Sequence, residues 1–113
     1  MTRPSKITET PPAAVEDALK RLGQNLRTAR LRRKLRIEDV AERIGASRFT
    51  VADVEKGKPS TSAAAYFGAL WALGLLNGVR DIADPDRDEE GKVLESVRQP
   101  KEAPRRRTLD NDF

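Results

Sequence analysis

The sequence of 113 residues predicts a small all-α protein with one hydrophobic core. Apolar residues recur at intervals of three and four from about residue 13 onward, which is the period of an amphipathic helix. Hydrophobic residues make up 37% of the chain and charged residues 35%, so the core must come from a limited stretch, between about Val15 and Ala83. We therefore expect a flexible arm over residues 1–12, a five-helix domain over residues 13–85 and a C-terminal extension over residues 86–113.

The first three helices are delimited by apolar spacing and by glycines. One apolar stripe predicts a helix from about residue 13 to residue 34. Its members are Val15, Leu19, Leu22, Leu26 and Ala29. A second, short helix begins near Ile37 and stops at Gly45, where a left-handed C-cap is expected. A third runs from about Arg48 to Lys56, because Ser47 can accept a hydrogen bond from the backbone N–H of Phe49 or Thr50.

The remaining segments are less regular. Ser60, Thr61 and Ser62 offer N-caps for a fourth helix that is apolar over much of its circumference. A fifth short helix is expected over residues 79–83 and ends at Pro85. Residues 89–98 predict a sixth helix that is too short to be stable alone and so needs a partner surface. Residues 99–113 are expected to be a disordered tail with two apolar anchors, Leu109 and Phe113.

Composition excludes several classes of function. The chain has no cysteine and no histidine, which removes the commonest metal ligands and the commonest general base. We expect no catalytic residue, no metal site and no cofactor. No apolar run approaches the roughly 18 residues that span a bilayer, and no signal peptide is evident. The sequence therefore predicts a cytoplasmic protein that does not bind membranes.

Positive charge is concentrated in one part of the chain. The net charge is +4, and residues 20–36 hold eight of the basic residues with no acidic residue between them. Such clustering favours a polyanionic partner, although a solvated helix face is the other interpretation of this run.

The second and third helices match a helix-turn-helix arrangement, in which the second helix of the pair enters the major groove of DNA. The segment from Leu35 to Ser60 resembles the Cro/phage-repressor class, also called the Xre class. The matching elements are Val40-Ala41, Ile44-Gly45, Ser47, Val51, Val54-Glu55 and Gly57, followed by a fourth helix ending in ALGL. The resemblance implies a five-helix, Cro/phage-repressor-like domain that binds double-stranded DNA.

The resemblance also assigns roles to residues. It places Arg48, Phe49, Ala52 and Asp53 at the base-reading positions. It places Arg36, Ser47, Thr50, Lys56 and Lys58 near phosphates. Arg48 can donate two hydrogen bonds to guanine O6 and N7, and Phe49 can pack on a thymine methyl group. Solvated charges on a helix face are the alternative interpretation of Arg48 and Lys56.

Two departures from the class affect this surface. Its second helix usually opens with Ser or Thr followed by Gln, whereas this chain has Arg36-Ile37. Asp53 adds a negative charge that repels phosphates unless it accepts a hydrogen bond from a cytosine amino group.

Proteins of this class usually dimerise on paired half-sites, which implies a homodimer on a palindromic operator. The predicted core or dimer contacts are Tyr66, Phe67, Leu70, Trp71, Leu75 and Leu76.

The segment LWALGLLNGVRDIADPDRDEEGKVL and the basic tail ending in LDNDF resemble HipB-type antitoxins. That resemblance extends over nearly everything from about Leu22 onward. It implies a repressor of its own operon that neutralises a HipA-type serine/threonine kinase toxin. Two alternatives remain open, namely a stand-alone regulator without a toxin partner and a protein-interaction module that has lost DNA binding. An unstructured, solubilising tail is the alternative interpretation of the C-terminal residues.

Overall fold

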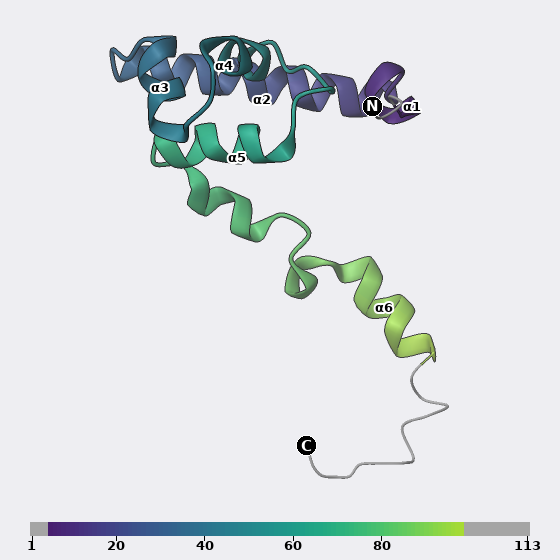
Figure 1. Ribbon diagram of the computed structural model, residues 1–113. Coiled ribbons are helices and arrows are strands. Elements are labelled where there is room, and N and C mark those ends of the chain that lie inside the picture. Colours follow the sequence, from purple (N-terminus) through teal and green to yellow (C-terminus); the bar gives the residue numbers. More distant parts are fainter. Residues whose placement is uncertain (1–4, 99–113) are drawn as a thin grey trace. The chain divides into compact units, whose positions relative to one another are not determined.

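The computed structural model describes residues 5–98, and every regular element within them is helical (Figure 1). The elements are α1 (Lys6–Glu9), α2 (Ala13–Arg32), α3 (Ile37–Ile44), α4 (Arg48–Glu55), α5 (Ala63–Ala72), the 3-10 helices η1 (Leu76–Asp81) and η2 (Pro85–Arg87), and α6 (Glu89–Arg98). The described residues fall into two compact units, one that ends at Asn77 and one that begins at Gly78. The predicted all-α fold class is confirmed.

Helices α2 to α4 lie within two residues of their expected bounds, and α6 is also present. Helix α5 begins after the predicted N-cap Ser62 and ends at Ala72, at the start of the ALGL segment. Three segments differ from expectation. The predicted flexible arm contains the short helix α1. The predicted fifth helix is the 3-10 helix η1, which begins earlier than expected. It includes Asn77 and Gly78, two residues with a low propensity for α-helix. Pro85 begins η2 rather than only ending a helix, because its ring suits a first helical position and Asp84 caps the turn. The tail predicted over residues 99–113 lies outside the described residues.

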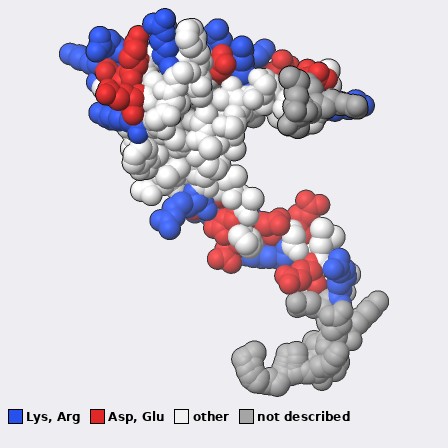
Figure 2. All heavy atoms as spheres, in the orientation of Figure 1, with Lys and Arg blue, Asp and Glu red and all other residues white. Residues whose placement is uncertain are grey.

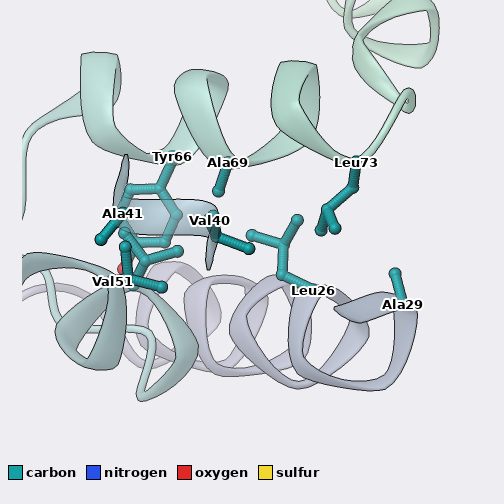
Figure 3. Close-up of a cluster of buried hydrophobic side chains, with 9 residues drawn as sticks. Leu26, Ala29, Val40, Ala41, Val51, Tyr66, Ala69 and Leu73 are labelled. Carbon is teal, nitrogen blue, oxygen red and sulfur yellow. The ribbon is translucent and has the colours of Figure 1, made fainter. Parts of the chain in front are cut away.

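The core is built where α5 packs across α3 and α4 and α2 packs against α4 (Figure 3). Its buried apolar residues are Leu26, Ala29, Val40, Ala41, Val51, Val54, Tyr66, Ala69 and Leu73. Among the predicted core or dimer contacts, Tyr66 is buried and Leu70 is half-buried. The other members of that set are exposed rather than part of the core: Phe67, Trp71, Leu75 and Leu76.

Helix α2 and the end of α4 meet backbone to backbone, and glycines make this possible. A Cβ atom on Gly23 would lie 2.6 Å from the carbonyl oxygens of Val54 and Glu55. A Cβ atom on Gly57 would lie 2.5 Å from the carbonyl oxygen of Leu19, and Gly57 also has a positive φ of 72°. Only glycine fits these two positions without moving a helix.

A buried ion pair joins the same two helices. Arg30 on α2 is only 7% exposed, and its Nε and Nη2 donate to the two carboxylate oxygens of Glu55 at 2.6 and 3.0 Å. Its Nη1 donates to the carbonyl oxygen of Leu35 at 3.0 Å. The hydrogen bond that Arg30 donates to Glu55 raises the pKa of Arg30 above its ordinary value, against the opposing effect of burial. Arg30 belongs to the basic run of residues 20–36 but is therefore not a solvated residue.

Replacing Arg30 with Met is expected to lower the free energy of unfolding by about 3–5 kcal/mol, because Glu55 keeps a buried charge without its partner. Urea unfolding followed by circular dichroism measures this loss. Arg27→Met is the matched control, since Arg27 is exposed on the same helix and its replacement is expected to change stability by less than about 0.5 kcal/mol. Equal stability of the two variants would contradict the structural role of Arg30.

Candidate nucleic-acid interface

The turn between α3 and α4 is held by hydrogen bonds at both of its ends. Gly45 ends α3 in the left-handed conformation, with a φ of 71°. The backbone N–H of Ala46 donates to the carbonyl oxygen of Ala41 at 3.0 Å. Ser47 then caps α4, because its hydroxyl accepts from the backbone N–H of Thr50 at 3.2 Å, one of the two donors that the sequence predicted. The turn therefore fixes the start of α4 relative to α3.

A carboxylate in the first turn of α3 caps the start of this helix. The Asp39 carboxylate accepts from the backbone N–H of Arg36 at 2.7 Å. This hydrogen bond lowers the pKa of Asp39, and the positive charge of Arg36 adds to the effect. Asp39 thus stabilises the helix start in a chain that lacks the Ser or Thr usual at this position in the class.

An open cleft of about 420 Å³ lies where α3 and α4 begin. Its lining residues are Arg30, Arg36, Ile37, Glu38, Arg48, Phe49 and Ala52. Three of the four predicted base-reading residues therefore border one hollow, together with one predicted phosphate contact, Arg36.

Arg48 and Phe49 form a stacked pair at the first turn of α4. The guanidinium carbon of Arg48 lies 5.1 Å from the centroid of the Phe49 ring. Phe49 is 68% exposed, although the cost of leaving an aromatic ring in water favours its burial. Nη1 of Arg48 also lies 3.7 Å from a carboxylate oxygen of Glu38 on α3. Both side chains lie in the first turn of α4, before its buried residues Val51 and Val54, and are accessible to a partner.

The fourth predicted base-reading residue, Asp53, is half-buried and paired with a cation. Its carboxylate lies 3.3 Å from the Lys58 ammonium group, which the sequence assigned to phosphates. The pairing offsets the negative charge that Asp53 adds to α4. The other predicted phosphate contacts differ in exposure: Ser47 and Lys56 are exposed and Thr50 is half-buried.

A model of the helix-turn-helix domain family matches residues 21–81 of the chain. The chain belongs to this helix-turn-helix family. It is accordingly a DNA-binding regulator of the Xre-like kind, and domains of this family are typically not enzymes. No curated protein and no solved structure matches the chain.

Three interactions of this helix-turn-helix domain escaped the sequence analysis. Arg36 and Asp39 have the spacing of a capping box, so that signal was available. The pairs Arg30–Glu55 and Arg48–Glu38 join different helices, and no local pattern predicts such pairs.

Residues 5–98 contain neither a candidate membrane span nor a candidate metal site. No helix there is both long and apolar enough to cross a membrane. No cluster of three or more acidic side chains there could hold a metal ion.

Proposed function

We propose that the chain is a transcriptional repressor that recognises a specific operator sequence through α4. The observation that carries this proposal is the exposed pair Arg48 and Phe49 at the start of that helix. A guanidinium group recognises guanine by a two-donor fork, and an aromatic ring covers a thymine methyl group. The pairing of Asp53 with Lys58 supports DNA binding, because it removes an unpaired negative charge from the proposed interface.

A salt titration tests whether binding depends on sequence. The wild-type chain would select an operator from random-sequence duplexes, and its affinity would be compared with that for a scrambled duplex of equal composition. We expect a preference for the operator that persists at physiological salt. Arg48→Ala is expected to weaken operator binding by about 1–3 kcal/mol and scrambled-duplex binding much less.

The matched control for that change is Arg27→Ala, which removes one exposed arginine from α2. We expect Arg27→Ala to preserve the ratio of the two affinities. An equal loss on both duplexes with Arg48→Ala would assign Arg48 to a phosphate. Absence of any preference in the wild-type chain would overturn the proposed function and favour an interaction module that has lost DNA binding.

The outer surface of α5 supports the proposal of a homodimer. Figure 2 shows charged side chains gathered over α2, α3 and α4, and an uncharged surface over α5. Phe67 and Trp71 lie one turn apart on α5 and are 44% and 59% exposed, while Tyr66 and Ala69 face the core. Exposed aromatic residues at this spacing are typical of a contact between protein chains. A second copy on this surface would present two α4 helices to a palindromic operator.

Trp71→Glu is expected to convert the dimer to a monomer, because a desolvated carboxylate at the contact has no partner charge. Analytical ultracentrifugation measures the change, and operator affinity should fall with it. Val15→Glu adds the same charge at an exposed apolar residue of α2 and should leave the dimer intact. A wild-type chain that sediments as a monomer would exclude this dimer.

We further propose the antitoxin role that the resemblance to HipB-type proteins implies. The supporting observation is one apolar side of α6, where Val93, Leu94 and Val97 are 61%, 59% and 67% exposed. A helix of ten residues with an uncovered apolar side gains stability by packing on a partner. The proposed partner is a HipA-type kinase encoded in the same operon.

Leu94→Glu is expected to weaken binding of that kinase at least about ten-fold, because it places a charge on the apolar side of α6. Isothermal titration of the purified kinase with the full chain measures the affinity. Ser96→Glu is the matched control, since Ser96 is exposed on the same helix and points about 160° away from Leu94. Failure of the wild-type chain to bind the kinase would instead support a stand-alone regulator.

A further inference from the structure

Glu38 has no role in the function proposed above, yet it lies beside the residue on which that function depends. Its carboxylate on α3 is 3.7 Å from Nη1 of Arg48, and the two side chains are 58% and 62% exposed. Arg48 is therefore held between a carboxylate of the neighbouring helix and the ring of Phe49.

The capping of α3 leaves Glu38 available for this contact. Asp39 accepts the hydrogen bond from the backbone N–H of Arg36, so the start of the helix does not depend on Glu38. Exposed ion pairs of this length contribute little to the stability of a fold. The contact is better explained by what it does to Arg48 than by what it adds to folding.

An exposed arginine at a DNA surface has two kinds of acceptor within reach. Phosphate oxygens are present in every sequence, whereas guanine O6 and N7 occur only at particular base pairs. A carboxylate beside the guanidinium repels phosphates and restricts its direction. Because the contact with Glu38 uses Nη1, the edge formed by Nε and Nη2 can still donate both hydrogen bonds to guanine.

We propose that Glu38 is a specificity-determining residue that positions Arg48 on guanine and keeps it away from phosphates. The stacking of Arg48 on Phe49 further predicts the sequence that is recognised. Because the two side chains lie side by side, we expect them to contact adjacent base pairs, so that each half-site has a G·C pair directly beside a T·A pair. This inference rests on the proposed function, since it needs α4 to bind an operator.

The test compares wild-type and Glu38→Gln chains on the selected operator and on the scrambled duplex over a range of salt concentrations. Freed from Glu38, Arg48 is expected to contact one more phosphate. The logarithm of the affinity should then fall more steeply with the logarithm of salt concentration, by about 0.9 in slope. The ratio of operator to scrambled affinity should decrease about ten-fold, because a two-donor contact to guanine is lost.

Glu42→Gln is the matched control, because Glu42 is exposed one turn further along the same side of α3. It removes the same charge, so a general electrostatic effect would appear in both variants. We expect Glu42→Gln to preserve the affinity ratio. In a chain that already carries Arg48→Ala, we expect Glu38→Gln to leave the ratio unchanged.

The outcomes separate this inference from the proposed function. If the wild-type and Glu38→Gln chains discriminate equally well between the two duplexes, the proposed role of Glu38 is overturned and the proposed function stands. A selected operator without adjacent G·C and T·A pairs would overturn the predicted recognition sequence. A wild-type chain without discrimination would overturn both the inference and the proposed function.

Discussion

The ion pair between Arg30 and Glu55 is the interaction on which the position of α4 depends. Helix α4 has only eight residues, which is too short to be stable alone, so its place is set by what packs against it. Arg30 holds the last residue of α4 on α2, while the glycines at positions 23 and 57 allow the two backbones to meet. Anchoring through the C-terminal end leaves the first turn of α4, with Arg48 and Phe49, facing outward.

The same packing divides the residues of α5 between two environments. Tyr66 and Ala69 enter the core, and the Tyr66 hydroxyl donates to the carbonyl oxygen of Lys58 at 2.8 Å, which ties α5 to the loop after α4. Burial raises the pKa of Tyr66, and the nearby Asp53 adds to this effect, so the hydroxyl remains a donor. Phe67 and Trp71 lie outside the core. Helix α5 thus supports α3 and α4 from the core and carries the proposed dimer surface on its other side.

Local signals predicted the elements well, whereas pairings between elements were not predictable from the sequence. Gly45 and Ser47 act within a few residues of themselves, so their roles as caps could be derived from spacing. Arg30 and Glu55 are 25 residues apart, so no local spacing predicts that they pair, although Arg30 follows Leu26 by four residues and so lies on the buried side of α2. The fifth helix was expected to be α-helical because apolar spacing alone does not separate an α-helix from a short 3-10 segment.

Net charge describes the proposed interface only coarsely, because it does not show which basic residues have an acidic neighbour in the folded chain. The sequence has an excess of basic residues, which predicts attraction to any polyanion. In the folded chain, Arg48 and Lys58 each face a carboxylate, from Glu38 and Asp53 respectively. Cations that already have a neighbouring acid gain less from phosphates, which are alike in every sequence, than unpaired cations do. In the proposed repressor, the arrangement of charges on α3, on α4 and in the loop after α4 would therefore favour discrimination between DNA sequences over uniform affinity for DNA.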